Sequence, residues 1–132
     1  MKPIVLVSTY PDKKSITKIA NDFVKTKLVA CVNISKISSI YSWNKKIENT
    51  SEYLAIFKTV PKNKKLLQQK IKDSHPYEVP EIAEIDVTSI NKEYLNWMVQ
   101  STNYISTAYL SKETMPPKPV TLRPISVDES TL

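Results

Sequence analysis

Glycine is absent from all 132 residues of this sequence. Glycine supplies backbone conformations with positive φ and allows a backbone to approach a ligand closely. The glycine-rich phosphate loop, the dinucleotide-binding fingerprint and the nucleophile elbow of serine hydrolases all depend on these properties. The sequence therefore argues against nucleotide-dependent and serine-hydrolase chemistry.

Cysteine is nearly absent as well, since Cys31 is the only one. One thiol excludes an intramolecular disulfide and any zinc site built from several thiolates of one chain. No apolar run approaches the ~18 residues of a membrane span, and the apolar segment 4–7 is too short for the core of a signal peptide. We therefore expect no membrane partner and a cytoplasmic location.

Arginine occurs once, at Arg123, although the formal net charge is +6. The lysines are scattered among the apolar positions of two predicted helices, which is typical of solvated helix faces. The glycine-aromatic motif of RNA-binding domains is missing. These features argue against a nucleic-acid partner.

The apolar pattern predicts strands and helices within one domain. Residues 4–7 form a continuous apolar run, typical of a buried strand. Asp12 can cap the following helix, which should run to about Lys27. Its buried face has the spacing of one helical stripe, at Ile16, Ile19, Ala20, Phe23 and Val24.

A long segment rich in β-branched residues, 28–43, predicts the next strand. Its apolar positions change from even to odd numbers near residues 35–36, so we expect a bulge or a twist there. Residues 44–45 are the predicted turn, and 53–60 the predicted returning strand. The tip of this hairpin should project beyond a small domain.

Pro61 suits the first turn of a second helix, which ends before His75. A strand over 82–87 follows, and then a short helix that Asn91 can cap. The order β-α-β-β-α-β is that of a ferredoxin-like α+β sandwich, here with an extra C-terminal helix. In this fold two helices cover one face of a four-stranded antiparallel sheet, and the other face needs a partner if it is apolar.

Residues 104–132 differ in composition from the domain predicted over 1–103. Four prolines and few strong hydrophobes predict an extended tail without a core of its own. We expect the tail to dock on its own or a neighbouring subunit, with Val120 and Leu122 as alternating anchors.

The segment His75-Pro76-Tyr77-Glu78-Val79-Pro80-Glu81 holds the only histidine together with two prolines and two carboxylates. The prolines stop the preceding helix and keep the backbone extended, so the side chains of His75, Tyr77 and Glu81 are presented at fixed positions. Two interpretations are open: a rigid connector with a hydrogen-bonded histidine, or a functional loop.

Six separated motifs, taken together in order and spacing, resemble the CutA divalent-cation-tolerance family over about residues 4–99. They are Thr9-Tyr10-Pro11-Asp12, Leu28-Val29-Ala30-Cys31-Val32-Asn33, Ser39-Ile40-Tyr41-Ser42-Trp43, Lys58-Thr59, His75-Pro76-Tyr77-Glu78-Val79-Pro80-Glu81-Ile82 and Tyr94-Leu95-Asn96-Trp97. The resemblance implies a ferredoxin-like protomer in a tight homotrimer, in which the long hairpins continue the neighbours' sheets. It also implies links to copper and other divalent cations.

The hairpin tip departs from the family pattern. Members usually have Trp-x-Gly-Lys there, whereas this chain has Trp43-Asn44-Lys45-Lys46. Lysine thus stands where a positive φ is favourable only for glycine. We expect a different turn, with Asn44 in the left-handed position.

The candidate metal ligands are Cys31, His75 and Glu81, with Glu78 as an alternative to Glu81. Cys31 is a soft ligand suited to Cu(I), His75 suits copper or zinc, and Glu81 or Glu78 could complete the set. One chain offers too few soft ligands for a closed site, but symmetry could bring the loop of one subunit against a strand of another. The competing interpretation of Cys31 is a small buried hydrophobe.

A pocket at the subunit cleft is expected to include Lys58, Tyr77, Glu78 and Trp43 from the hairpin. Lys58 must either emerge at the end of its strand or meet a carboxylate such as Glu81. Its charge opposes a bare metal cation and favours an anion.

Three function classes follow. The first is a non-enzymatic trimeric protein of metal homeostasis that binds divalent or cuprous ions and needs no organic cofactor. The second is a PII-like signalling trimer, whose cleft binds a small anionic ligand and whose hairpins contact a protein partner. The third, an acylphosphatase-type enzyme on the same fold, would need an arginine near a glycine-containing phosphate loop, and Arg123 lies in the tail.

Overall fold

The computed structural model describes residues 1–105, so the tail predicted over 104–132 lies outside the described residues from residue 106 onward. Four antiparallel strands form one sheet in the order β2-β3-β1-β4. The strands are β1 (Ile4–Tyr10), β2 (Cys31–Trp43), β3 (Lys46–Thr59) and β4 (Ala83–Ile85).

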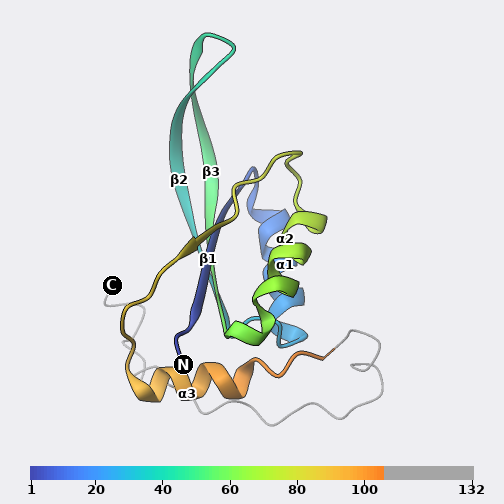
Figure 1. Ribbon diagram of the computed structural model, residues 1–132. Coiled ribbons are helices and arrows are strands. Elements are labelled where there is room, and N and C mark those ends of the chain that lie inside the picture. The colour runs from blue at the N-terminus through green and yellow to red at the C-terminus, as the bar shows by residue number, and fades with distance from the viewer. Residues whose placement is uncertain (106–132) are drawn as a thin grey trace, which may run out of the picture.

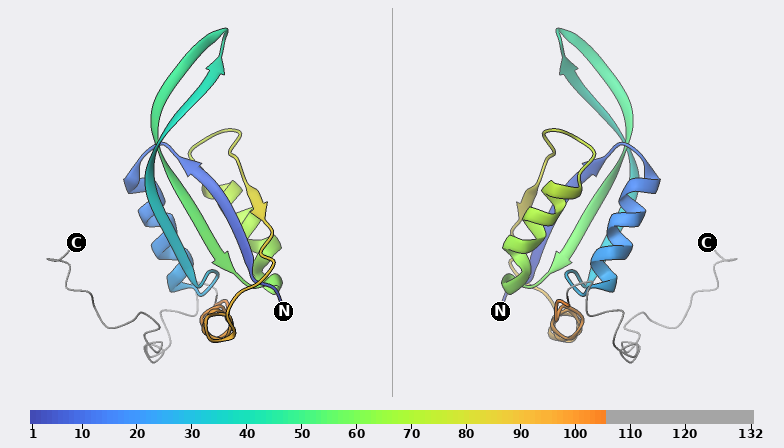
Figure 2. Two further views of the ribbon diagram at one scale, coloured as in Figure 1. Left: turned by 90° about the vertical axis from the view of Figure 1, so that its left-hand side faces the viewer. Right: turned by 90° about the vertical axis from the view of Figure 1, so that its right-hand side faces the viewer.

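The helices complete a two-layer structure. Helices α1 (Lys13–Lys25) and α2 (Lys64–Ser74) lie side by side on one face of the sheet (Figure 1, and Figure 2, right). A single 3-10 turn, Pro61–Asn63, leads into α2, and α3 (Lys92–Ser101) follows β4. The predicted ferredoxin-like α+β fold with an extra C-terminal helix is confirmed.

Helix α1 begins where the sequence predicts. The Asp12 carboxylate accepts a hydrogen bond from the Ser15 backbone N–H at 2.7 Å, which satisfies a donor that the first helical turn leaves free. Four residues of the predicted apolar stripe are buried, namely Ile16, Ile19, Ala20 and Phe23, but Val24 is 45% exposed. Val24 lies at the margin of the stripe, so its predicted burial was wrong.

The core lies between the helices and one face of the sheet. Leu6 and Tyr10 of β1 and Ala55 and Phe57 of β3 are fully buried. The helix residues that pack with them are Ile16, Ile19, Phe23, Leu67 and Ile71. Because side chains alternate along a strand, the intervening apolar residues face the other side, where they are half-buried: Val5, Val7, Leu54 and Ile56.

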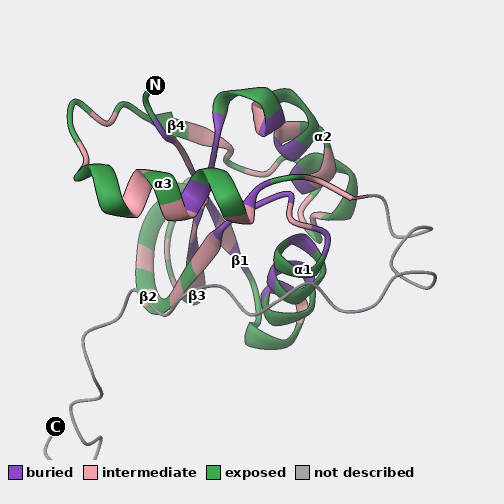
Figure 3. Cartoon of the chain, turned by 90° about the horizontal axis from the view of Figure 1, so that it is seen from below, coloured by how far each residue is buried: buried purple, intermediate pink, exposed green. Residues whose placement is uncertain are grey.

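The lower end of the sheet is closed by α3, which Figure 3 shows from below. Met98 is its buried residue. The buried Asn63 side chain fastens this end, because its amide donates to the carbonyl oxygens of Leu28 at 3.1 Å and Thr102 at 3.0 Å. The predicted side-chain cap by Asn91 was wrong, since this residue precedes α3 but makes no capping hydrogen bond with its side chain.

The last described residues stay attached to the core. Tyr104 packs against the core cluster, and the Ile105 backbone N–H donates to the Thr26 carbonyl at 2.7 Å.

The β2–β3 hairpin extends well beyond the rest of the sheet. β1 pairs with β3 only from Ile4↔Thr59 to Tyr10↔Tyr53, whereas β2 pairs with β3 as far as Trp43↔Lys46. The seven pairs from Ile37↔Glu52 onward therefore form a two-stranded overhang, about 23 Å long at 3.3 Å per residue. The returning strand begins at residue 46 rather than at the predicted 53.

The register excludes the predicted bulge. Every residue from Cys31 to Trp43 has one partner on β3, without interruption near residues 35–36. Because side chains alternate without interruption, Ile37 lies on the opposite face of the ribbon from Val32 and Ile34. The other expected feature, a twist, is visible where the hairpin leaves the sheet (Figure 2).

The turn at the tip uses two left-handed residues. Asn44 has φ 51° and Lys45 has φ 63°. Asn44 is left-handed as predicted, and Lys45 is left-handed as well. Positive φ at both central residues is typical of the type I′ turn, whose twist matches that of the flanking strands. Lysine in this conformation is disfavoured by roughly 1–2 kcal/mol, because its Cβ approaches the following carbonyl oxygen.

Replacing Lys45 with glycine should stabilise the hairpin. We expect Lys45→Gly to raise the free energy of unfolding by about 0.5–1 kcal/mol, since glycine adopts positive φ without the steric penalty. Denaturant unfolding at fixed protein concentration measures this change. Lys46→Gly is the matched control and should destabilise by a similar amount, because residue 46 lies in β3 with ordinary backbone geometry. Destabilisation by both variants would contradict the argument.

Candidate functional site

The His-Pro loop (residues 75–82) begins directly after α2. His75 is extended, with φ −73° and ψ 134°, and precedes Pro76, which disfavours helical geometry in the residue before it. The His75 side chain returns to β1, where its Nε2 lies 3.0 Å from the Ser8 hydroxyl oxygen. The loop is therefore fixed to the central strand of the sheet.

Both nitrogens of the His75 ring are engaged. Nδ1 accepts a hydrogen bond from the Tyr77 backbone N–H at 3.1 Å. In a neutral imidazole the other nitrogen then carries the proton, so Nε2–H donates to the Ser8 hydroxyl. Burial lowers the His75 pKa, and a hydrogen bond to the Thr9 backbone only partly opposes this shift. His75 is thus neutral at pH 7.

Two aromatic rings stack on His75. The ring of Tyr10 stacks on it with centroids 4.2 Å apart, and that of Tyr77 with centroids 5.3 Å apart. Tyr10 is fully buried, and its hydroxyl forms no hydrogen bond of good geometry within the described residues. Burial raises the pKa of Tyr10 to about 12, although the nearby Ser8 hydroxyl works in the opposite direction.

Ser8 and His75 are not a nucleophile and its base. Ser8 has no exposed surface, so a substrate does not reach it. Nε2 of His75 already carries a proton and has no lone pair with which to take the serine proton. The geometry matches the first interpretation of the loop, a rigid connector with a hydrogen-bonded histidine.

Tyr77 makes the second attachment of the loop. Its hydroxyl donates to Glu52 Oε2 at 2.7 Å, and burial together with this carboxylate raises the Tyr77 pKa. Burial works against the charge of Glu52, but the hydroxyl groups of Tyr77, Ser39 and Thr9 outweigh it and lower its pKa. Glu52 is therefore an ionised carboxylate stabilised by hydroxyl donors.

Sequence reasoning missed Glu52, Ser8 and Tyr10 as partners of the loop. A signal for Glu52 was available in the predicted turn at 44–45. Counting outward from this turn places Glu52 opposite Ile37, in the seventh pair of the hairpin. Ser8 and Tyr10 carried no such signal, because they lie more than sixty residues from His75 in the chain.

The candidate metal ligands do not meet within one chain. Cys31 lies at the start of β2, on the sheet face away from α1 and α2, and pairs with Lys58. His75 contacts the helix-covered face through Ser8, and Glu81 is exposed in the loop. Within residues 1–105 no three His, Cys, Asp or Glu side chains are grouped closely enough to hold a metal ion.

Lys58 does not meet Glu81. Its ammonium lies 5.6 Å from the centre of the Tyr94 ring, a cation–π contact that links β3 to α3. Tyr94 in turn packs on Trp97, with ring centroids 5.3 Å apart. The ion pairs of the described chain are Lys2–Asp86 and Lys64–Glu84, and neither involves Lys58.

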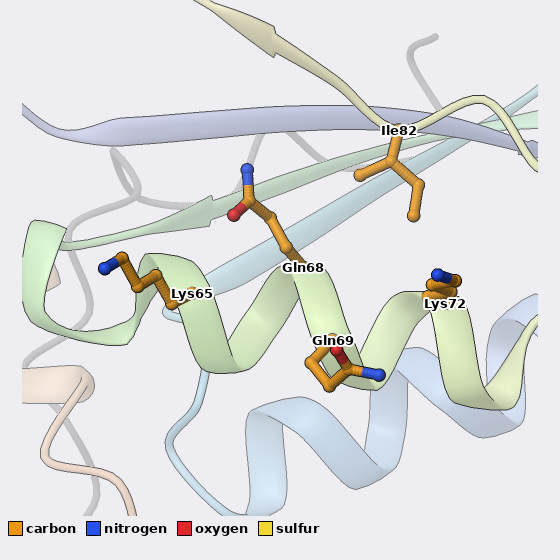
Figure 4. A pocket seen from close by; sticks show the side chains of 5 residues that line it. All are labelled: Lys65, Gln68, Gln69, Lys72 and Ile82. Carbon is orange, nitrogen blue, oxygen red and sulfur yellow. The ribbon is translucent and has the colours of Figure 1, made fainter.

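Of the predicted cleft residues, Tyr77 is the one that joins His75. Glu78 is exposed in the loop, and Trp43 is 64% exposed at the hairpin tip. An open hollow of ≈ 380 Å³ beside α2, near the segment that leads into β4, contains none of the predicted site residues (Figure 4). It is lined by Lys65, Gln68, Gln69, Lys72 and Ile82.

The depressed pKa of His75 has a consequence for stability. An unfolded histidine has a pKa near ~6.5, so the folded state disfavours protonation relative to the unfolded state. The stability contributed by neutral His75 is present above this value and is lost as the pH falls through the lower, folded pKa. We expect the free energy of unfolding to decrease between about pH 7 and pH 5.

His75→Gln tests this expectation, because His75 is the only histidine. Urea unfolding at fixed protein concentration should show a flatter pH dependence for the variant over that range. Equal pH slopes for the two proteins would contradict the argument.

Comparison with known proteins identifies the family. The family model of the CutA1 divalent ion tolerance protein matches residues 4–101. The divalent-cation tolerance protein CutA of Thermococcus kodakarensis is 39% identical over 100 residues, which cover 76% of this chain and 96% of the relative.

Solved structures agree with this match. Pyrococcus horikoshii CutA superposes with a TM-score of 0.72 at 38% identity, covering 75% of this chain and 98% of that one. The Archaeoglobus fulgidus protein, described as a periplasmic divalent cation tolerance protein, superposes with a TM-score of 0.71 at 31% identity, covering 76% and 98%. This chain therefore belongs to the CutA1 divalent ion tolerance protein family.

Proposed function

We propose that this protein is a non-enzymatic homotrimer of divalent-cation tolerance, which binds copper or other metal ions at or near the clefts between subunits. The observation that carries the proposal is the overhanging hairpin. Ile40, Trp43 and Ile47 on it are 69%, 64% and 75% exposed. An isolated two-stranded ribbon with apolar side chains on both faces is marginally stable in water.

The edge of the sheet supports association as well. β2 pairs with β3 over 13 residues, and its other edge has no partner strand in the described chain. Long open edges recruit further strands, so a second copy is the natural partner. A ring of three is the assembly that the family resemblance implies, and its hairpins would cover both the edges and the exposed apolar residues.

Metal binding in this proposal depends on residues from different subunits. Cys31 is half-buried, and its thiol makes only a weak 3.8 Å hydrogen bond to Asn33, so it is free to coordinate. His75 must exchange its bond to Ser8 or to Tyr77 for a bond to the metal. Glu81 is exposed and can supply an oxygen ligand.

The rival function, a PII-like trimer that binds a small anion, is favoured by one observation. Lys58 lies beside Cys31 across the β2–β3 ladder, and no carboxylate of the described residues pairs with it. Its ammonium repels a bare cation at this place and attracts an anion or a metal with anionic ligands.

No helix of residues 1–105 is long and apolar enough to cross a membrane. The cytoplasmic location predicted from the sequence is part of the proposal, and cell fractionation tests it. Recovery of the protein with periplasmic markers would place it with the Archaeoglobus fulgidus relative, which is described as periplasmic.

The trimer is tested by measuring mass in solution. Analytical ultracentrifugation at micromolar concentration should give three times the chain mass, and thermal unfolding should depend on concentration. Ile40→Ser combined with Ile47→Ser should shift the mass towards the monomer, because both side chains lose apolar contact area. Val24→Ser, at an exposed position of α1, is the control and should remain trimeric. A monomeric wild type would refute the proposal.

Metal binding is tested by calorimetric titration with Cu(I), Cu(II) and Zn(II). Cys31→Ser and His75→Ala should each weaken copper binding about tenfold or more without dissociating the trimer. Glu93→Gln, on the exposed start of α3, should bind as the wild type does. Unchanged titrations in both test variants would place the metal elsewhere. Under the rival function, Lys58→Ala would abolish the binding of anionic metabolites and leave copper binding intact.

A further inference from the structure

The root of the hairpin is a mechanically weak point of the fold. β1 ends its pairing at Tyr10↔Tyr53, so the hairpin continues from there with two strands instead of three. Two-stranded ribbons twist more strongly than wider sheets and have little stability of their own. Without further contacts, the direction of the overhang would depend on the two-stranded ladder alone.

The His-Pro loop contacts the molecule on both sides of this point. His75 is fixed to β1 by its bond to Ser8 and by the stacked ring of Tyr10. Tyr77 is fixed to Glu52, the first residue of β3 beyond the last β1 pair. In Figure 1 the loop after α2 rises beside the root of the hairpin.

The two attachments are joined rigidly to each other. The Tyr77 backbone N–H bonds to His75 Nδ1, and the two rings stack with an interplanar angle of 29°. Pro76 between them fixes one further backbone dihedral. A displacement of Glu52 relative to Ser8 must therefore break the Tyr77–Glu52 bond or disrupt the stack.

We infer that residues 75–77 act as a brace that holds the overhanging hairpin at a fixed angle to the sheet, with Tyr77 and Glu52 as its positioning pair. The bond between them has a charged acceptor, and such bonds are about twice as strong as neutral ones. Because Glu52 lies at the root, fixing it restricts the six pairs beyond it.

The brace also bears on the proposed function. A hairpin with a fixed direction is pre-organised to meet a neighbouring subunit, so less conformational freedom is lost on assembly. In this one respect the inference rests on the proposed trimer; the brace itself is a property of a single chain.

The test uses two substitutions that keep the side-chain shape. Tyr77→Phe removes the hydroxyl donor, and Glu52→Gln replaces the charged acceptor with a neutral amide oxygen, which leaves a weaker hydrogen bond. Amide hydrogen exchange on the full chain should accelerate about tenfold in segments 37–43 and 46–52 of Tyr77→Phe, since one charge-assisted hydrogen bond is lost. Glu52→Gln should accelerate exchange in the same segments by a smaller factor, because only the charge of the acceptor is lost. Exchange in the paired segments 4–10 and 53–59 should stay at the wild-type rate. In the double variant the acceleration should be less than the product of the two single accelerations, because both changes act on the same bond.

Matched controls lie on the same hairpin. Tyr41→Phe and Glu48→Gln change the same residue types at directly opposite positions nearer the tip, and both should exchange at the wild-type rate. Unchanged exchange in Tyr77→Phe and Glu52→Gln would overturn the inference. So would an equal acceleration in every strand, because it reports general destabilisation.

Mass measurement of the same samples separates the two proposals. A monomeric wild type whose hairpin exchange still responds to both substitutions refutes the trimer and supports the brace. Trimeric variants with wild-type exchange refute the brace and leave the trimer standing.

Discussion

The constraint on which the rest of the structure depends is the loss of β1 as a neighbour halfway along the β2–β3 hairpin. Below Tyr10↔Tyr53 the hairpin is backed by a third strand and by the helices, and its apolar residues on the helix-covered face are buried. Above it, Ile40, Trp43 and Ile47 extend into solvent on two strands alone. The overhang therefore requires a turn that suits the twist and support at its root, and in the proposed trimer its apolar surface gains a partner.

The polar groups around the root show how that support is achieved without a third strand. Glu52 keeps its charge because hydroxyl groups from three other segments compensate for its partial burial. His75 uses one nitrogen to bind β1 and the other to orient Tyr77. Because both ring nitrogens of His75 already form hydrogen bonds that fix the loop, coordination of a metal would have to break one of these bonds. The Cys31 thiol forms only a weak hydrogen bond to Asn33, so it would lose less than His75 by binding the metal of the proposed function.

Membership of the CutA1 family explains the fold, but the chemistry depends on what surrounds each candidate residue. The face of the sheet away from α1 and α2 carries half-buried aliphatic residues together with Cys31 and Lys58. The thiol suits a soft cation and the ammonium suits an anion, so the two proposed ligands make opposite electrostatic demands on one surface. If subunits associate through this surface, as proposed, the attraction of an anion to Lys58 and its repulsion of a bare cation would both become stronger, because charges interact more strongly away from water.

The sequence by itself determined the order of elements, the stripe of α1, the cap at Asp12, the turn at 44–45 and the stop after α2, because each depends on neighbours within a few residues. It also contained the motifs of the family. Only the tertiary structure decided what the site residues touch. Ser8 meets His75, and Glu52 meets Tyr77, because strand order and register bring distant segments together. Local periodicity shows which face of an element is buried, but it carries no information about which element covers that face.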